Sequence, residues 1–361
     1  MGFQRRDDGG AAQRGGAVRV AIDGRKIRDY GIGTYIRGLL RGLDEIGGND
    51  EYIVLAPESA RDVIPPRFTH VALDAPHYSI RELFMVGRAA ERAGADLLHA
   101  PHYVVPYTGL PVVVTIHDLI HLSHSNPLAR LYARTMIGRA ASRARRVLTV
   151  SEAVKDDIVR TFRTAPEKVI VTPNGIDEVY RAGASAARRS RYFLFVGNDK
   201  PHKNLDRLIE AFEMVRRDAP GVSLVLVGSE FERFHERIGV IASGFTTEAE
   251  LAALYRNAIA LVQPSLDEGF GLPAAEAMAS GTAVITSNAR ALLEVTGDAA
   301  VHVDANSVES IAAAMRSLLA DDAMRAKFAQ RGVERARKFN WRRTAEMTRD
   351  VYRDAFHLDF R

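Results

Sequence analysis

The stretch from Pro264 to Gly281 constrains the fold most, because it joins the end of a buried strand, a glycine loop and the start of a helix. The apolar run 260–262 predicts the strand, and Pro273 suits the first helical position, where a missing N–H costs nothing. Gly269 and Gly271 lack a Cβ, so a ligand can approach their backbone closely. The N–H groups of the following helix start point the same way, which favours an anion such as a pyrophosphate.

Two glutamates flank this loop: Glu268 lies within it, and Glu276 begins the second turn of the helix. The two carboxylate oxygens of Glu276 can accept hydrogen bonds from vicinal hydroxyls, as on a ribose, and Glu268 can bind a hydroxyl of a neighbouring sugar. The alternative is an amphipathic helix behind a glycine turn, with both carboxylates merely solvated. The loop, the spacing and the following Ala-Met-Ala-Ser-Gly together disfavour this alternative.

The same stretch resembles the paired-glutamate signature of retaining GT-B-fold glycosyltransferases of family 4, in which two Glu separated by seven residues surround a Gly-Phe-Gly loop. The resemblance implies an α/β fold of two Rossmann-like, doubly wound domains facing across a cleft, with a C-terminal helix that crosses back to the N-terminal domain. It also implies a catalytic role for Glu268. The donor-binding residues that it implies here are Ser265, Gly269, Phe270, Gly271, Leu272 and Glu276.

Strand and helix patterns alternate along the whole chain, which predicts parallel sheets. We expect a loose tail at 1–16, an N-terminal acceptor-binding domain at 17–181, a small, polar linker at 182–190, a C-terminal nucleotide-sugar-binding domain at 191–340 and the returning helix at 341–361, with Trp341 at the bend. Residues 229–240 are charged where typical family members have a further strand and helix, so we expect a shortened loop there.

The run Gly197-Asn198-Asp199-Lys200-Pro201-His202-Lys203-Asn204 looks like the family's glycine-to-lysine phosphate loop. A fixed ammonium at Lys203 would stabilise the charge that builds up on a departing diphosphate, so we expect Lys203 to be catalytic. A surface lysine at a helix start is the alternative. Many relatives carry arginine where this chain has Asn198 and His202, so either Lys200 compensates or the pocket is less cationic; we include Asn198 among the donor-binding residues.

The N-terminal half offers a weaker signal. Gly31 and Gly33 follow the first strand and resemble the family's acceptor-side glycine loop, although a tight turn without a ligand is the alternative. His117 follows the apolar strand 112–116, at the edge where open parallel sheets bind ligands, and resembles the active-site histidine facing the donor sugar. The alternative is a core histidine with satisfied hydrogen bonds. Asp118 and His121 are weaker candidates.

Composition limits the kinds of metal, redox and membrane-spanning features that the chain can contain. The chain has no cysteine, which excludes disulfides and thiolate metal sites, and it has eleven histidines. The pair Asp118-x2-His121 lacks a third ligand at useful spacing and no Asp-x-Asp occurs, so we expect a metal-free site with no cofactor besides the nucleotide-sugar donor. No apolar run reaches ~18 residues and the first 16 residues are polar, which suggests a cytoplasmic protein.

The expected reaction is transfer of a hexose, with retention and without a metal, to a hydroxyl of a glycan or polyprenyl-linked acceptor in cell-surface polysaccharide synthesis. The phosphate loop looks like that of bacterial mannosyltransferases, so GDP-mannose is the first choice of donor and a UDP-sugar the second. A non-catalytic, nucleotide-sugar-binding GT-B subunit remains an alternative. A nicotinamide oxidoreductase is disfavoured, because neither half has Gly-x-Gly-x-x-Gly followed ~20 residues later by an acid.

A net charge of +4 suits phosphorylated small molecules or an anionic membrane face better than nucleic acid, for which no motif is present. We expect peripheral membrane contact through residues 127–147, although a solvated helix is the alternative. At ~100° per residue the six arginines there project in two nearly opposite directions. These arginines are Arg130, Arg134, Arg139, Arg143, Arg145 and Arg146, and no acidic residue lies among them.

Overall fold

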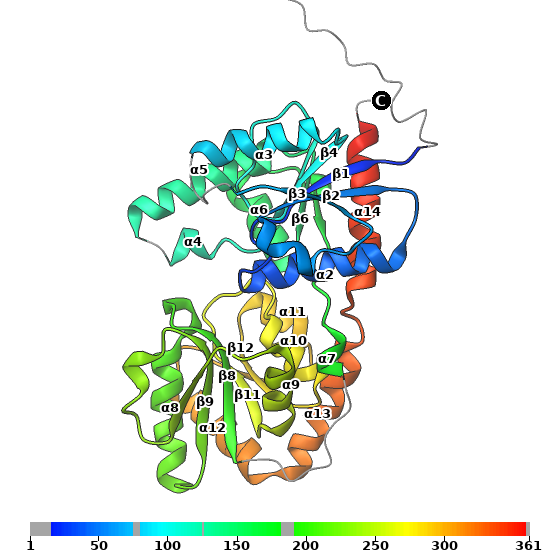
Figure 1. The fold of residues 1–361 in the computed structure, drawn as a ribbon. Helices are drawn as coiled ribbons and strands as arrows, with labels where there is room; N and C mark the ends of the chain where they lie inside the picture. Colours follow the sequence, from blue (N-terminus) through cyan, green and yellow to red (C-terminus); the bar gives the residue numbers. More distant parts are fainter. Residues whose placement is uncertain (1–15, 75–79, 125, 182–190, 359–361) are drawn as a thin grey trace, which may run out of the picture.

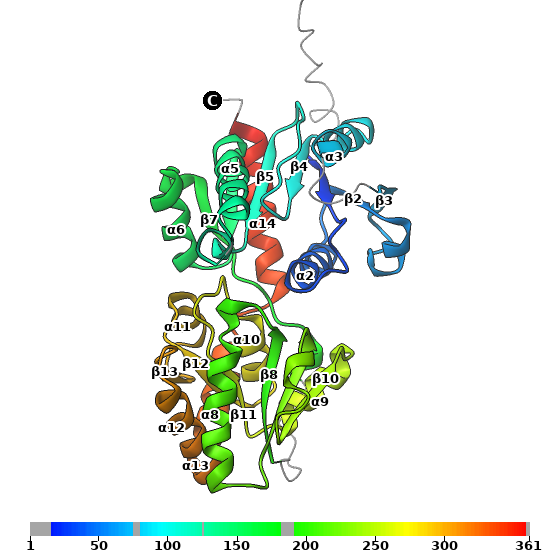
Figure 2. The same cartoon turned by 90° about the vertical axis from the view of Figure 1, so that its left-hand side faces the viewer.

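The computed structural model describes residues 16–74, 80–124, 126–181 and 191–358. The predicted linker at 182–190 and nearly all of the predicted tail therefore lie outside the described residues. Two α/β halves are stacked one above the other, and each is built around its own parallel sheet (Figures 1 and 2). This confirms the predicted fold class.

The N-terminal half contains a seven-stranded sheet in the order β3-β2-β1-β4-β5-β6-β7, with every pair parallel. Its inner strands, such as β4 and β5, are fully buried because helices cover both faces, whereas the edge strand β3 is only partly buried. The strands are β1 (Arg19–Asp23), β2 (Glu51–Ala56), β3 (Thr69–Ala72), β4 (Leu97–Ala100), β5 (Val112–Ile116), β6 (Arg146–Thr149) and β7 (Val169–Val171). The helices are α2 (Gly31–Ile46), η1 (Glu58–Val63), α3 (Ile80–Arg92), α4 (Ile120–Ser123), α5 (Pro127–Arg143), α6 (Glu152–Phe162), η2 (Pro166–Lys168) and α7 (Glu178–Arg181).

The C-terminal half contains a six-stranded parallel sheet in the order β10-β9-β8-β11-β12-β13. Its strands are β8 (Tyr192–Asn198), β9 (Ser223–Ser229), β10 (Val240–Gly244), β11 (Ala260–Gln263), β12 (Ala283–Ser287) and β13 (Val301–Val303). Its helices are η3 (Pro201–Lys203), α8 (Leu205–Asp218), η4 (Glu232–Phe234), α9 (Glu248–Asn257), α10 (Leu272–Ala279), α11 (Arg290–Thr296), α12 (Val308–Ala320) and α13 (Asp322–Ala336).

The last helix, α14 (Trp341–His357), leaves the C-terminal half and packs beside α2 in the N-terminal half, as predicted (Figure 1). Trp341 begins this helix and is buried, and its indole Nε1–H donates to Asp177 Oδ1 at 2.6 Å. A Cβ on Gly38 would lie 2.1 Å from the indole ring, and one on Gly175 would lie 2.3 Å from the Trp341 backbone nitrogen. These two glycines therefore make room for the tryptophan at the bend.

Two local features were not predicted. Residues 229–240, for which we expected a shortened loop, contain η4 and lead directly into β10. Strand β10 was missed because it is an edge strand whose five residues are only partly buried or exposed, and it contains the weak strand formers Ala and Gly. Helix α5 also ends earlier than expected, at Arg143. Arg145 and Arg146 instead reach α14, where they bond to Ala355 O at 2.8 Å and Asp354 Oδ2 at 2.6 Å.

Candidate active site

A cleft with a volume of about 490 Å³ lies between the two halves. In open parallel sheets, ligands bind beyond the carboxyl ends of the strands, where the strand order reverses. In the C-terminal sheet this point lies between β8 and β11, and residues that follow both strands line the cleft. The N-terminal half contributes the opposite wall, which includes Arg28, Asp29, Tyr30, Gly31, Ile32, Thr34, Arg37, His117 and Asp118.

Lys203 and Glu268 meet in this cleft. The Lys203 ammonium lies 2.7 Å from Glu268 Oε1, which also accepts hydrogen bonds from Gln263 Nε2 at 2.7 Å and from Ser265 Oγ at 2.8 Å. Burial on its own would raise the pKa of Glu268, but the Lys203 charge and these hydrogen bonds outweigh it and hold the pKa below its ordinary value. Glu268 is therefore a carboxylate at neutral pH, as a partner for a sugar hydroxyl requires.

Ser265 was predicted to bind the donor, but it is fully buried and is absent from the cleft lining. It supports Glu268 from behind instead. Gln263, which the sequence analysis did not single out, has the same function. Its amide oxygen accepts from Ala274 N–H at 3.1 Å, so one side chain ties Glu268 to the first turn of α10. A polar residue at the end of a buried strand was the available signal.

Glu276 lines the cleft, as predicted, from the second turn of α10. Its Oε2 accepts a hydrogen bond from the buried Tyr255 hydroxyl at 2.9 Å. Burial raises the pKa of Glu276 to about 8, because removal from water disfavours the charged form more than this one hydrogen bond favours it. The site therefore holds a carboxyl group that is short of hydrogen-bond donors.

The glycine loop between the two glutamates packs against the N-terminal half. A Cβ on Gly269 would lie 2.1 Å from the His117 carbonyl oxygen, and the Gly269 carbonyl accepts from Ser151 Oγ at 2.8 Å. Gly271 has a φ of +92°, a conformation that side chains disfavour. Phe270 and Leu272 also line the cleft, although the Phe270 ring mainly packs edge-on against Phe339. Gly269 thus serves close packing of the two halves as well as access to the cleft.

His117 lines the cleft from the N-terminal side. Its Nε2 lies 3.0 Å from the Pro101 carbonyl oxygen, which can only accept, so Nε2 carries the proton and Nδ1 is left as an acceptor. Burial lowers the pKa of His117 despite this bond, which keeps the ring neutral. Asp118 also lines the cleft, whereas His121 does not; its ring packs against Tyr103.

Of the remaining predicted site residues, some line the cleft and others do not. Helix α2 begins at Gly31, so Gly31 and Gly33 lie in its first turn rather than in a preceding loop. Gly31 lines the cleft, but Gly33 does not, because it packs against the backbone of the preceding loop, where a Cβ would lie 2.6 Å from Ile27 O. Asn198 lines the cleft, and its buried Oδ1 has no hydrogen-bond partner among the described residues. Lys200 is exposed and outside the lining, so it does not replace the missing arginine there.

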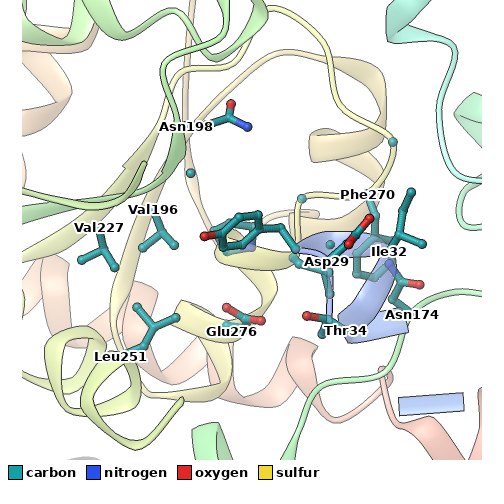
Figure 3. A pocket seen from close by; sticks show the side chains of 18 of the residues that line it. Asp29, Ile32, Thr34, Asn174, Val196, Asn198, Val227, Leu251, Phe270 and Glu276 are labelled. Carbon is teal, nitrogen blue, oxygen red and sulfur yellow. The ribbon is translucent and has the colours of Figure 1, made fainter. Parts of the chain in front are cut away.

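The sequence did not indicate which groups of the N-terminal half meet the C-terminal half at the mouth of the cleft. Tyr30 stacks on Phe245 with ring centroids 5.4 Å apart and planes at 15°. Arg37, which also lines the cleft, lies 3.5 Å from Glu248 at the start of α9. Figure 3 shows Val196, Val227 and Leu251 grouped at one end of the cleft, next to Glu276. The cleft therefore combines an apolar end with a charged centre.

Two negative observations apply to the described residues. In residues 16–74, 80–124, 126–181 and 191–358, no three or more His, Asp or Glu side chains are grouped so as to hold a metal ion. No helix in the same ranges is both long and apolar enough to span a bilayer.

Comparison with known proteins places the chain in a family. Residues 30–179 match the model described as Glycosyltransferase Family 4, and residues 177–335 match Glycosyl transferases group 1. O-antigen chain mannosyltransferase B from Escherichia coli is 27% identical over 281 residues, which cover 71% of this chain and 74% of that protein. A glycogen synthase from Mycobacterium tuberculosis is 31% identical over 288 residues, which cover 71% and 68%.

Solved structures share the fold. Sucrose-phosphate synthase from Thermosynechococcus elongatus superimposes with a TM-score of 0.74 at 20% identity, over 94% of this chain and 99% of that one. HepE from Anabaena, solved with UDP-glucose, gives a TM-score of 0.74 at 16% identity, over 93% and 99%. The chain therefore belongs to family 4 of the glycosyltransferases and has the GT-B fold, in agreement with its two stacked parallel sheets and its returning helix.

Proposed function

We propose that this glycosyltransferase transfers mannose from GDP-mannose, with retention and without a metal ion, to a hydroxyl of a glycan or lipid-linked acceptor in cell-surface polysaccharide synthesis. The observation that carries the proposal is the meeting of Lys203, Glu268 and Glu276 in one cleft, at the point where the C-terminal strand order reverses. The apolar group of Val196, Val227 and Leu251 suits a nucleobase, and Glu276 suits the ribose hydroxyls beside it (Figure 3).

The chemistry follows from the charges. As the bond between the sugar C1 and the diphosphate oxygen breaks, negative charge builds up on the leaving oxygen, and the Lys203 ammonium stabilises it. The acceptor hydroxyl oxygen forms the new bond to C1 on the same face, and its proton passes to the leaving diphosphate oxygen. Glu268 and His117 Nδ1 hold hydroxyls of the sugar as it becomes oxocarbenium-like. NMR of the product should show the anomeric configuration of the donor, and an inverted product would refute retention.

The choice of GDP rests on the resemblance of the loop 197–204 to that of bacterial mannosyltransferases, and the choice of mannose is supported by two relatives whose names state mannosyl transfer. These are the O-antigen chain mannosyltransferase above and MMP alpha-(1->4)-mannosyltransferase from Mycolicibacterium hassiacum, which is 32% identical over 68% of this chain and 66% of that protein. A UDP-sugar donor is the second candidate, because the HepE structure holds UDP-glucose. Thermal unfolding with GDP, UDP and ADP would separate them, since a ligand bound only by the native state raises Tm. Stabilisation by UDP alone would overturn GDP-mannose.

Turnover and metal dependence need a separate assay. GDP-mannose that carries a label on its mannose, incubated with a cell extract containing acceptors, should give labelled product at the same rate with or without EDTA. Loss of activity in EDTA would contradict the metal-free site. Tight binding of GDP without turnover of any donor would instead favour the non-catalytic subunit.

We also propose that a face of the N-terminal half contacts anionic lipid, where a lipid-linked acceptor would be found. The face is formed by Phe84 and Met85 of α3, the loop residue Tyr107, and Leu128, Leu131, Tyr132, Arg139 and Arg143 of α5; the α5 members lie on one side of that helix at ~100° per residue. Leu128 is 82% exposed and Leu131 63% exposed, which is unusual for leucine.

Contacts within this α3–α5 face place arginines over aromatic rings. The Arg139 guanidinium lies 4.0 Å and that of Arg143 5.6 Å from the Tyr107 ring, which stacks on Phe84 at 5.1 Å. Helix α5 contains no acidic residue, and of the two in α3, Glu82 is buried and paired with Arg25 at 2.8 Å, which leaves Glu91 as the one other carboxylate of these two helices. Exposed apolar groups flanked by arginines suit the interface of an anionic bilayer.

Sedimentation with vesicles tests this contact. The protein should sediment with phosphatidylglycerol vesicles at low salt and dissociate as salt rises. Leu128→Ser combined with Leu131→Ser, and Arg143→Gln alone, should each weaken sedimentation, because Arg143 is the exposed arginine of the face. Arg146→Gln should not, because Arg146 pairs with Asp354 on α14. Absence of sedimentation of the unaltered protein at low salt would overturn the proposal.

A further inference from the structure

A buried charge cluster lies at the carboxyl edge of the N-terminal sheet, where β1 and β4 are neighbours and the strand order reverses. It contains Asp23 at the end of β1, Arg25 two residues later, Glu82 of α3 and His102 just after β4; each is at most 5% exposed. None of the four lines the cleft. The cluster thus has no role in the reaction as described so far.

We propose that Asp23 and His102 are positioning residues, which act through the Pro101 carbonyl to hold His117 with Nδ1 free for the reacting sugar. The inference rests on the proposed role of His117 at the donor sugar.

The first link is between Asp23 and Arg25. The Arg25 guanidinium donates Nε–H to Asp23 Oδ1 at 2.8 Å and Nη2–H to Oδ2 at 2.7 Å, a two-pronged pair that fixes the plane of the carboxylate. Burial on its own would raise the pKa of Asp23, but hydrogen bonds from His102 and Arg25 and the Arg25 charge hold it well below its ordinary value. Asp23 is therefore an oriented anion.

The second link is between Asp23 and His102. The Val104 N–H donates to His102 Nδ1 at 3.2 Å, so Nδ1 is an acceptor and the ring proton is on Nε2. Nε2 then donates to Asp23 Oδ2, which lies 3.2 Å away. Both ring nitrogens have fixed partners, and the imidazole is held in one orientation.

The third link passes through the backbone. The carbonyl of Pro101 and the N–H of His102 belong to one planar peptide, and the ring of Pro101 fixes its φ. The direction of the carbonyl depends on ψ of Pro101 and φ of His102, so anchoring the His102 side chain to Asp23 restricts how far this peptide can turn. This carbonyl accepts the His117 Nε2–H at 3.0 Å, and the Tyr35 ring packs edge-on against His117 with centroids 4.8 Å apart. His117 therefore keeps the tautomer that leaves Nδ1 as an acceptor.

Matched substitutions separate positioning from general support of the fold. Asp23→Asn keeps the shape of the side chain but removes the negative charge that His102 faces. Glu82 Oε1 accepts from Arg25 Nη2 at 2.8 Å, so Glu82→Gln removes the other carboxylate bound to Arg25 and leaves the contact between Asp23 and His102 in place. Asp23→Asn should lower kcat about tenfold and change the donor KM by less than about twofold, because it misplaces a group used in the transition state. Glu82→Gln should leave both constants within about twofold.

Two variants of His102 test the same link if Asp23→Asn does not fold. His102→Gln retains an N–H that can reach Asp23, so kcat should stay within about threefold of the unaltered protein, whereas His102→Leu should match Asp23→Asn. In the ligand-free protein, ¹⁵N NMR of labelled histidine should show His117 protonated on Nε2, and a mixture of tautomers in His102→Leu. The His117 signal is assigned by its loss in His117→Gln.

The inference is overturned if Glu82→Gln lowers kcat as much as Asp23→Asn, if the two His102 variants behave alike, or if the His117 tautomer does not change in His102→Leu. The NMR measurement needs no substrate. If no nucleotide sugar is turned over, the proposed function fails while the tautomer comparison still decides this inference.

Discussion

Lys203 Nζ lies 2.7 Å from Glu268 Oε1, so the ammonium proposed to receive the diphosphate is paired, before any donor binds, with the carboxylate proposed to hold the sugar. Both side chains are mostly buried, at 15% and 8% exposure. The Lys203 charge thus helps to keep Glu268 ionised, and the ion pair holds both side chains in place. The donor enters a site whose charges are already arranged, which favours the transition state because little reorganisation remains.

Lys203→Ala should lower kcat about a hundredfold or more, because the charge on the leaving group loses its cation. It should also lower the free energy of unfolding by about 1–3 kcal/mol, since Glu268 is left buried without its counter-charge. Adding Glu268→Gln should recover stability but not activity. Urea denaturation and initial rates check both parts, and recovered activity in the double variant would contradict the role of Lys203.

Glu276 should make stability fall as pH rises. Burial raises its folded-state pKa to about 8 from an ordinary value of 4.5, so the folded protein binds more protons than the unfolded chain between these values. Stability from this group is fully present below about pH 4.5 and is lost as pH rises through about 8. Glu276→Gln should therefore have a higher Tm than the unaltered protein at pH 8.5, and a similar one at pH 5.

Nucleotide affinity should show the opposite trend, because two ribose hydroxyls donate better to a carboxylate than to a carboxylic acid. Calorimetric titration of GDP should give tighter binding at pH 8.5 than at pH 6. Glu276→Gln should bind more weakly with a flat pH profile, whereas Glu210→Gln, an exposed control on α8, should match the unaltered protein. A flat profile in the unaltered protein would count against ribose binding by Glu276.

Trp341 is the sole tryptophan, so its fluorescence reports the docking of α14. Gly38→Ala places a Cβ 2.1 Å from the indole ring and should cost about 1–3 kcal/mol, with a red-shifted emission as the ring moves towards water. Gly31→Ala, in the same helix but with no atom within 4 Å of the new Cβ, should not destabilise the protein. Equal stability of the two variants would mean that the bend tolerates repacking.

Gly269→Ala should separate catalysis from nucleotide binding. Its Cβ would lie 2.1 Å from the His117 carbonyl oxygen, so the loop carrying Glu268 must move away from the N-terminal half. We expect kcat to fall more than about tenfold, with the Kd for GDP changed by less than about threefold. A large loss of GDP affinity with unchanged kcat would show that Gly269 mainly serves the nucleotide.

The sequence predicts the site where its parts are close together in the chain. The loop from Glu268 to Glu276 has a local pattern of glycines, proline and spacing, and the structure keeps it as one turn leading into α10. Contacts between distant residues carry no such pattern. The pairing of Lys203 with Glu268, 65 residues away, was not predicted, and neither was the Tyr30–Phe245 stack between the halves.

Edge and surface elements were also difficult to predict. Strand β10 has side chains that are only partly buried or exposed, so its sequence lacks the apolar run of an inner strand. The break after Arg143 was missed because residues 144–146 continue a helix-compatible composition, and only the neighbouring sheet and α14 make Arg146 the start of a strand. Tertiary contacts overrode local preference at both places.

The return of α14 to α2 has a consequence for biosynthesis. Ribosomes make the chain from the N-terminus, so strands β1 to β7 emerge first, yet Trp341, Val351 and Tyr352, which complete their core, emerge after the entire second sheet. Until then the side of α2 at Gly38 and Gly42, which Trp341 and Ala345 cover in the finished chain, lacks its partner. The half that is translated first is therefore completed last, and a chain that ends before Trp341 would leave one side of its core uncovered.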